Sequence, residues 1–371
     1  MCGSPLGGMG IMDFELKEEE ELIRKLARDF ASKEFPELKA GVEEGTFPFE
    51  LWRKACAAKL VGPRIPEEYG GAGVSMLASI LIQEEFCRVN PRLGEALASA
   101  TLGSDLLIRF GTREQRERYL PPLAGGRARM GVVGIEEGRM FKACGERMEG
   151  EVELPSSPPP EYLVVAGWLG GEPSLVLVET EGKLRGRKLL LEGEMGEVIG
   201  EKGQAPTMIR DFLTLHRIER SGQALGTAEG ALERALRYLE EREGLGKPAW
   251  DYSQTLRKLA EIKTEIEASR WLVYRAALSV DEGKCDQVLA TMAEWKAGRT
   301  AVMAAEEAAM LHEGTWGHLE DYGVERFQSF SLLHPRFPPF SAQKFTPSRF
   351  LSEGLEEVER FLRKSGTRGV S

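Results

Sequence analysis

Residues 65–75 read IPEEYGGAGVS, so that a proline, two acidic residues and a tyrosine run directly into a segment with three glycines. This composition is unsuited to any helix, and we predict a loop over residues 66–73. Upstream of the loop, Ile23, Leu26 and Phe30 recur at helical spacing between charged residues. The stretch therefore predicts a sharp break inside a helical region.

The helical region is predicted to extend from Met12 to about residue 128. Thr112, with Gln115 three residues later, forms the pattern of a capping box at the start of its last helix. Pro121 and Pro122 predict the end of that helix, because proline lacks the backbone N–H that a helix needs. The helices predicted around and after the loop cover residues 50–59, 75–87, 94–110 and 112–120.

The pattern changes at about Arg129, where short β-rich runs begin. Clusters of Gly, Pro and Ser separate these runs, including SSPPP at residues 156–160. Short runs between turn-forming residues are typical of a small all-β domain. The predicted strands cover residues 130–135, 149–154, 162–166, 174–178 and 188–191.

From about Thr207 the chain is predicted to be helical again. Two long segments carry apolar stripes at helical spacing, which is typical of a helix bundle. Trp271 and Trp295 are interpreted as core or interface anchors, and a last amphipathic helix is predicted over residues 352–364. The first stripe comprises Leu259, Ile262, Ile266 and Val273, and the second comprises Val288, Met292, Trp295 and Val302.

Composition excludes several classes of protein. The 371 residues have a formal net charge of −10 and 42% hydrophobic residues, which disfavours both bulk nucleic-acid binding and disorder. No apolar run approaches the ~20 residues of a membrane span. The five cysteines are far apart and form no CxxC pair, which favours reduced thiols in the cytoplasm and no metal site.

The segments follow the order helical, β, helical. We predict a mainly α protein with a small central β domain. Residues 1–11 have no basic and apolar regions of the secretory type and are interpreted as an N-terminal extension. The predicted domains are a helical domain at 12–128, a β domain at 129–206 and a helical bundle at 207–371.

Several stretches in this order resemble the acyl-CoA dehydrogenase family. The resemblance implies a helical N-terminal domain, a β-barrel-like middle domain and a C-terminal four-helix bundle that builds dimers or tetramers. It also implies a flavoprotein oxidoreductase of fatty acid metabolism that holds FAD and an acyl-CoA. The stretches are FPFELW at 47–52, IPEEYGGAGVS at 65–75, FGTREQ at 110–115, RYLPPL at 118–123, REGLGKP at 242–248, EIEASR at 265–270 and YGVER at 322–326.

In the family, a Glu shortly after the Val-Glu-Arg element removes the α-proton of the substrate. Here no acidic residue occurs between Glu325 and Glu353, and Pro338 falls where that Glu is expected. Proline cannot act as a base. The usual catalytic Glu is therefore missing, and a packed Phe/Pro loop is the plain structural alternative.

Some members of the family have the base just before an Arg early in the C-terminal domain, which corresponds here to His216. A histidine titrates near neutral pH, so His216 is the candidate base, although it also suits a structural role. Arg217 corresponds to the family's CoA-contacting Arg. Its alternative is a surface or inter-helix ion pair.

The resemblance also implies contacts to FAD. Arg242 corresponds to the Arg that reaches the FAD pyrophosphate of the neighbouring subunit, and Gly246 follows it in the same matched stretch. Gly314 matches one glycine of the loop that receives the adenine end, and Ser156 replaces a hydroxyl near the flavin. The family's Trp-containing strand over the flavin has no equivalent here.

Three functional hypotheses remain open at this stage. The first is a protein with a degenerate active site, acting in the cytoplasm as a non-catalytic subunit or acyl-CoA-binding partner. It would form a homodimer, a homotetramer or a mixed tetramer with a catalytic paralogue. The second is an active FAD-dependent enzyme that uses a non-standard base such as His216. The third is an oligomeric scaffold without ligand.

Overall fold

The structure is a computed structural model of the whole chain. It describes residues 16–35, 47–133, 135, 141–144, 147–153, 159–185, 188–194, 196–244, 247–248, 251–312, 324 and 327.

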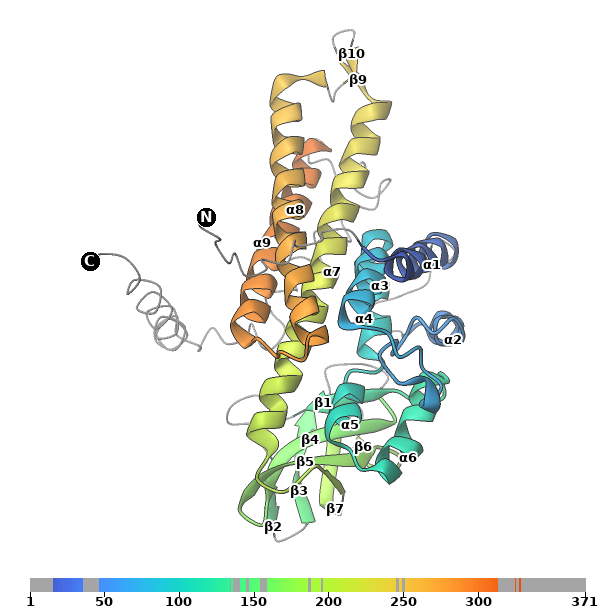
Figure 1. The fold of residues 1–371 in the computed structure, drawn as a ribbon, viewed down its shortest axis with the longest axis vertical. Helices are drawn as coiled ribbons and strands as arrows, with labels where there is room; N and C mark the ends of the chain where they lie inside the picture. The colour runs from blue at the N-terminus through green and yellow to red at the C-terminus, as the bar shows by residue number, and fades with distance from the viewer. Residues whose placement is uncertain are drawn as a thin grey trace, which may run out of the picture.

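The N-terminal part is helical, as predicted, and lies beside one long helix of the C-terminal part (Figure 1). Where one helix was predicted over residues 94–110, two helices form, with residues 100–103 between them. Gly103 occupies this break, where a Cβ would lie 2.9 Å from Met130. The helices are α1 (Glu18–Glu34), α2 (Phe49–Ala57), α3 (Met76–Val89), α4 (Pro91–Ser99), α5 (Ser104–Phe110) and α6 (Arg113–Ala124).

The glycine-rich stretch between α2 and α3 is a tight turn, but the prediction that it contains no helix is wrong. Glu67–Tyr69 form one short 3₁₀ turn, η2, which tolerates this composition because it needs so few hydrogen bonds. Gly70 ends the turn at φ +91°. At Gly71 a Cβ would lie 1.9 Å from the carbonyl oxygen of Ile65, so only glycine fits.

The predicted capping box of α6 is confirmed. The Thr112 hydroxyl accepts from the Gln115 N–H at 3.2 Å, and the Gln115 side chain accepts from the Thr112 N–H at 3.0 Å. The predicted end at Pro121 is wrong, because α6 continues to Ala124. Both prolines lie in the last turn of α6. Because proline has no N–H, the carbonyls of Glu117 and Arg118 have no helical hydrogen bond, but both residues are exposed and can bond to water.

The middle part forms one eight-stranded sheet with the order β6-β7-β3-β2-β4-β5-β8, and β1 pairs parallel with β4. All five predicted strands are present. Sequence reasoning missed three short ones: β2, β6 and β8. The strands are β1 (Met130–Val133), β2 (Phe141–Cys144), β3 (Arg147–Glu153), β4 (Tyr162–Leu169), β5 (Glu172–Glu179), β6 (Leu184–Arg185), β7 (Lys188–Glu194) and β8 (Glu197–Ile199).

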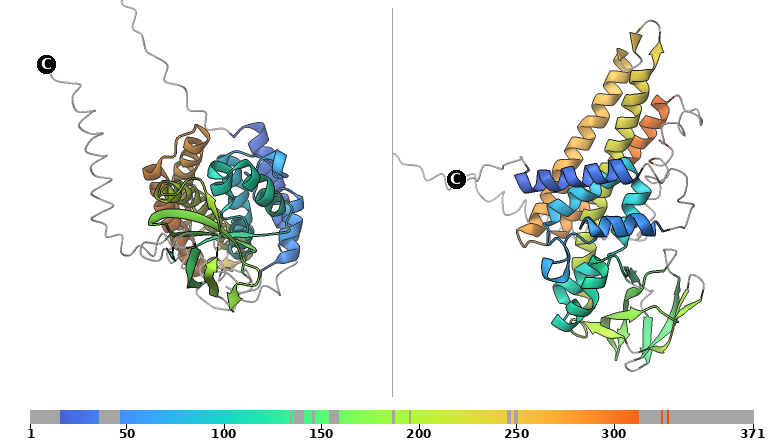
Figure 2. Two further views of the ribbon diagram at one scale, coloured as in Figure 1. Left: turned by 90° about the horizontal axis from the view of Figure 1, so that it is seen from below. Right: turned by 90° about the vertical axis from the view of Figure 1, so that its right-hand side faces the viewer.

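Three long helices follow: α7 (Ala205–Glu241), α8 (Ser253–Asp281) and α9 (Gln287–Leu311). A two-stranded ribbon, β9 (Glu243–Gly244) with β10 (Lys247–Pro248), joins α7 to α8 at the end far from the sheet (Figures 1 and 2). The last predicted helix, over residues 352–364, lies outside the described residues.

The predicted stripe of α8 is buried, whereas that of α9 is not. Ile262, Ile266 and Val273 are at most 1% exposed, but Met292 is 51% and Trp295 is 52% exposed. Periodicity finds an apolar stripe without showing what it faces. The buried face of α9 is instead made almost entirely of alanines: Ala290, Ala293, Ala297, Ala301, Ala304, Ala305 and Ala308.

Helices α3 and α7 approach each other closely through three glycines of α7. A Cβ on Gly222 would lie 2.9 Å from the Ile80 side chain. A Cβ on Gly226 or Gly230 would lie 2.1 Å from the Glu84 carbonyl oxygen or 2.2 Å from that of Arg88, respectively. Because these positions recur every four residues, the contact runs along both helices. The segment GQALG at residues 222–226 is part of this contact.

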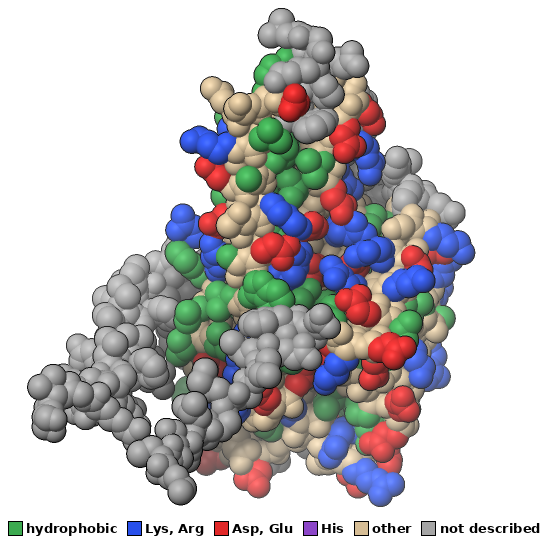
Figure 3. Space-filling model, turned by 45° about the horizontal axis from the view of Figure 1, so that its top comes forward, with side chains coloured by type: hydrophobic (Ala, Val, Ile, Leu, Met, Phe, Trp, Pro, Cys, Tyr) green, Lys and Arg blue, Asp and Glu red, His purple; other side chains and the backbone are tan. Residues whose placement is uncertain are grey.

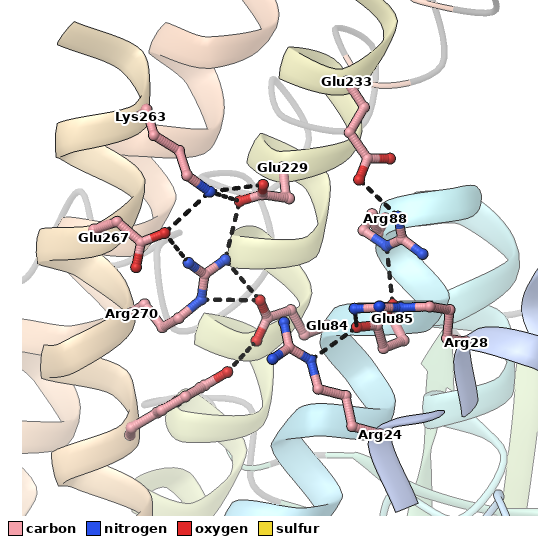
Figure 4. A network of polar contacts seen from close by, with 11 residues as sticks. Arg24, Arg28, Glu84, Glu85, Arg88, Glu229, Glu233, Lys263, Glu267 and Arg270 are labelled. Carbon is pink, nitrogen blue, oxygen red and sulfur yellow. Dashed lines mark hydrogen bonds and ion pairs between the residues drawn. The ribbon is translucent and has the colours of Figure 1, made fainter. Parts of the chain in front are cut away.

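Two adjacent carboxylates of α3 hold the surrounding helices together (Figure 4). The buried Glu84 carboxylate accepts from the Arg270 guanidinium at 2.8 Å and from the Tyr274 hydroxyl at 2.7 Å, both on α8. Glu85, also buried, accepts from Arg24 of α1 at 3.0 Å and from Arg28 at 2.7 Å. The pair thereby links the N-terminal helices to the bundle.

We expect Gly226→Ala to destabilise the fold by about 1–3 kcal/mol, because a methyl group there overlaps a backbone carbonyl that cannot move away. This outweighs the ~1 kcal/mol by which alanine favours a helix over glycine. Urea denaturation followed by circular dichroism measures the change. Arg237→Ala, an exposed position of α7, is the control and should change stability by less than about 0.5 kcal/mol. An unchanged or more stable Gly226→Ala protein would contradict the close contact.

We expect Glu84→Gln to lower the free energy of unfolding by about 2–4 kcal/mol, because the amide keeps the shape but leaves buried donors of Arg270 and Tyr274 without their carboxylate. Glu282→Gln is the matched control, since Glu282 forms an exposed pair with Lys284 and surface pairs contribute little to stability. Equal effects of the two substitutions would show that Glu84 has no special role.

Candidate functional site

Helix α7 carries His216 and Arg217, the candidate base and the candidate CoA contact. It starts beside the sheet and ends at the ribbon of β9 and β10 (Figure 1). His216 and Arg217 lie in its first half, where α5 and α9 also pack. Arg242 directly follows its last residue. At 1.5 Å per residue, His216 and Arg242 are separated by about 39 Å along the helix axis.

His216 is half-buried beside Phe212. Its ring stacks on Phe212, with centroids 5.7 Å apart and planes 7° from parallel. Its Nδ1 atom has no hydrogen-bond partner among the described residues, and the nearest carboxylate oxygen, of Glu219, is 4.0 Å away. Burial, with the adjacent charges of Arg220 and Arg217, lowers the pKa of His216 to about 3. The ring is therefore neutral at pH 7, and it is a weak base.

Arg217 forms an inter-helix contact, which is the alternative noted for it. Its Nη1 donates to the Thr291 hydroxyl of α9 at 3.1 Å, and its Nε lies 3.5 Å from Glu294. Arg220, one turn on, also faces Glu294, at 3.8 Å. Burial lowers the pKa of both arginines and raises that of Glu294. A CoA contact by Arg217 stays a prediction.

A second buried pair lies next to His216, and sequence reasoning missed it. Arg64, directly before the glycine-rich stretch, has its Nη1 3.0 Å from an oxygen of Asp105 on α5. Burial raises the pKa of Asp105 and of the neighbouring Glu219, and Arg64 opposes both shifts. No local signal in the sequence links Arg64 to Asp105, which lie 41 positions apart.

The space beside this pair is small. A cavity of about 30 Å³ lies between α3, α4, α5 and Glu219. Gln83, Thr101 and Asp105 are among its walls. One water molecule occupies about 30 Å³ in the liquid, whereas small-molecule sites are typically about 300–1,000 Å³. The described walls therefore leave no room for an acyl chain in this cavity.

Glu95 adds a further titrating carboxyl on α4. It is half-buried, and burial raises its pKa to about 7, while Arg220 and Arg92 oppose the shift. Together with Asp105, Glu219 and Glu294, it forms a set of acids whose pKa values are all raised. We call these four acids with His216, Arg64, Arg217 and Arg220 the α7 charge cluster.

The proposed FAD contacts are not brought together in the described part of the chain. Ser156, Gly246 and Gly314 lie outside the described residues. Arg242 Nη1 donates to the Tyr238 hydroxyl at 2.8 Å, one turn back on α7. This one guanidinium does not by itself make a cradle for a dinucleotide.

A larger cleft lies elsewhere, with a volume of about 580 Å³ between α1, α3, α7 and α8. The carboxylates of Glu84, Glu229 and Glu267 surround the guanidinium of Arg270, and Lys263 bonds Glu229 at 2.9 Å (Figure 4). Basic and acidic side chains are also interspersed on the face that Figure 3 shows. The opposite charges pair with each other, so this cleft serves to join helices.

Among the described residues no three His, Cys, Asp or Glu side chains gather as a metal site would require. The described cysteines 56, 87 and 285 are free thiols. None of the described helices has the length and apolar character needed to cross a membrane.

Two family models match the chain: "Acyl-CoA dehydrogenase, N-terminal domain" over residues 17–127 and "Acyl-CoA dehydrogenase, C-terminal domain" over residues 206–334. An acyl-CoA dehydrogenase of Bacillus subtilis is 32% identical over 347 residues, with 83% of this chain and 91% of the relative covered. A 3-(aryl)acrylate reductase of Clostridium sporogenes is 29% identical, with 83% and 92% covered.

Solved structures of the same family have the same fold as this chain. Butyryl-CoA dehydrogenase from Megasphaera elsdenii superposes with a TM-score of 0.79 at 26% identity, covering 87% of this chain and 95% of that one. A structure from work on the electron transferring flavoprotein of Acidaminococcus fermentans superposes with a TM-score of 0.82 at 27% identity, covering 92% and 99%. The predicted mainly α fold with a small sheet is confirmed, and the chain belongs to the acyl-CoA dehydrogenase family.

Proposed function

We propose that this chain is an acyl-CoA dehydrogenase-related protein without dehydrogenase activity of its own. It acts in the cytoplasm as a non-catalytic subunit or acyl-CoA-binding partner, in an oligomer of its own copies or with a catalytic paralogue. The observation that carries the proposal is the environment of His216, the one candidate base that sequence reasoning found. A base with a pKa of about 3 is poorly matched to proton removal near pH 7.

Two further observations support the same conclusion. Pro338 occupies the expected position of the family's Glu, and no acid lies between Glu325 and Glu353. In addition, Arg217 is engaged with α9 rather than left open toward a ligand. FAD is expected from the family, and bound flavin without turnover is compatible with this proposal.

The second candidate is a working flavoenzyme with a different reaction. Relatives named as reductases favour it, among them an acryloyl-CoA reductase (NADH) of Anaerotignum propionicum at 26% identity. Under this reading the chain transfers electrons through FAD without the usual base.

The two candidates differ in the response of purified protein to FAD and acyl-CoA. We expect protein saturated with FAD to keep its flavin absorbance when butyryl-CoA or longer acyl-CoAs are added, because the family's Glu is replaced by Pro338 and the pKa of His216 is too low for proton removal near pH 7. Calorimetric titration with acyl-CoA then separates a binding partner from a scaffold. Bleaching of the flavin by an acyl-CoA would contradict the proposal, and its loss in His216→Ala would identify the base. An active acyl-CoA dehydrogenase is the positive control.

The α7 charge cluster predicts a pH dependence of stability. The pKa of Glu95 is about 7 in the fold against an ordinary 4.5. Between pH 4.5 and pH 7 the Glu95 carboxyl is therefore protonated in the folded state but ionised in the unfolded state. The stability of the fold falls as pH rises through this range. We expect Glu95→Gln to be more stable than the original protein by about 1–3 kcal/mol at pH 8, with little difference at pH 4.5. Thermal unfolding at both pH values measures this.

The control is Glu240→Gln, an exposed position of α7, which should shift the two melting temperatures equally. A Glu95→Gln protein that gains nothing at pH 8 would show that Glu95 is not the destabilising charge.

A further inference from the structure

Three charged side chains from separate segments line one small cavity. Arg64 lies directly before the glycine-rich stretch, Asp105 lies on α5 and Glu219 lies on α7, and all three are among the walls of the cavity of about 30 Å³. Burial raises the pKa of Asp105, Arg64 opposes this shift and the charge of Glu219 adds to it, so the three groups interact. We call this space the triad cavity.

These three groups satisfy each other poorly. Arg64 Nη1 and Asp105 Oδ1 are 3.0 Å apart, but neither atom has a hydrogen-bond partner among the described residues, so the pair is close without being aligned. Glu219 lies 4.0 Å from Nδ1 of His216, which is too long for a hydrogen bond. Asp105 is 9% exposed, and a buried carboxylate without hydrogen bonds is costly. The walls of the triad cavity therefore need a further polar partner.

The size of the triad cavity limits what this partner can be. A buried water molecule needs roughly 10–15 Å³ of space and two to four polar contacts. A cavity of about 30 Å³ meets the first condition, and Arg64, Asp105 and Glu219 meet the second. An organic ligand would need a site about ten times larger. The cavity therefore accepts a molecule or ion of about the size of water.

The charges around the triad cavity select among species of this size. A small anion would face the carboxylates of Asp105 and Glu219, and a small cation would face the guanidinium of Arg64, to which it has no lone pair to offer. Water has two donors and two lone pairs, so it can donate to both carboxylates and accept from the guanidinium. The hydroxyls of Ser79 and Ser104, which also line the cavity, suit the remaining lone pair.

We propose that the triad cavity binds one internal water molecule, which donates to Asp105 and Glu219 and accepts from Arg64. The water connects the glycine-rich stretch, α5 and α7, because a bridging water is enthalpically nearly as favourable as a direct hydrogen bond. The inference goes beyond the proposed function, since it depends on neither FAD nor acyl-CoA. Failure of the flavin experiment would leave it standing, and the reverse also holds.

A crystal structure of the full chain, from crystals soaked in rubidium chloride, tests the site. We expect a single density peak about 2.7–3.2 Å from an oxygen of Asp105, an oxygen of Glu219 and a guanidinium nitrogen of Arg64, without anomalous scattering from rubidium. Three results would overturn the proposal: no peak in the cavity, a rubidium signal at the peak, or an Arg64 side chain that bonds both carboxylates directly and fills the space.

Variants of Glu219 test its part in holding the water. Glu219→Gln retains a side-chain oxygen that accepts hydrogen bonds, so the peak should stay. Glu219→Met has a similar length but only a weakly accepting sulfur, so the peak should be lost. Glu240→Met, at an exposed position of α7, is the matched control and should keep the peak.

Circular dichroism shows whether each variant is folded, and the Glu219→Gln result decides by itself if Glu219→Met does not fold. A peak that survives in Glu219→Met, or one that is lost in Glu219→Gln, would show that Glu219 does not hold the water and would overturn the assignment.

Discussion

The contact between α3 and α7 is the constraint on which the rest of the structure depends. Gly222, Gly226 and Gly230 bring the two backbones so close that no side chain fits between them. The dry contact fixes the rotation of α7 about its own axis, and with it the directions in which His216, Arg217 and Arg220 point. It also buries Glu84 and Glu85 on α3, where arginines of α1, α3 and α8 and a tyrosine of α8 offset the cost of removing charge from water.

The structure contains two groups of buried charges with different geometry. Around Glu84 and Glu85 most contacts are hydrogen bonds of 2.7–3.1 Å. In the α7 charge cluster, Glu294 lies 3.5 and 3.8 Å from its arginines, and atoms of Arg64, Asp105, Arg217 and Glu294 lack hydrogen bonds among the described residues. The first group is a fully hydrogen-bonded contact that joins helices. The second contains polar groups without all their hydrogen bonds, in the half of α7 where the family resemblance locates substrate chemistry. Unsatisfied buried polar groups are most common at functional sites.

Much of the fold followed from sequence pattern, and the failures have physical causes. The capping box of Thr112 and the strands around β4 and β5 depend on local chemistry, so they could be predicted. The exposed face of α9 could not, because an apolar stripe at helical spacing has the same pattern whether it faces a core or a partner. Likewise Arg64 meets Asp105 across 40 intervening positions, a pairing that no local signal encodes. His216 and Arg217 were found only through resemblance to a family, while the roles of Ser156, Gly246 and Gly314 stay predictions.

The alanine face of α9 has a mechanical consequence. Methyl groups make a smooth surface with shallow ridges, which offers little resistance to sliding of one helix along another. Polar contacts therefore help to fix the register of α9, among them the bonds of Thr291 with Arg217 and of Thr300 with Ser269 and the ion pairs of Glu294, Lys296 and Glu307. Arg217 is also the candidate ligand contact. A ligand that drew Arg217 away would remove its contacts with α9, so ligand binding at Arg217 and the packing of α9 on α7 would be coupled, each changing the free energy of the other by the same amount.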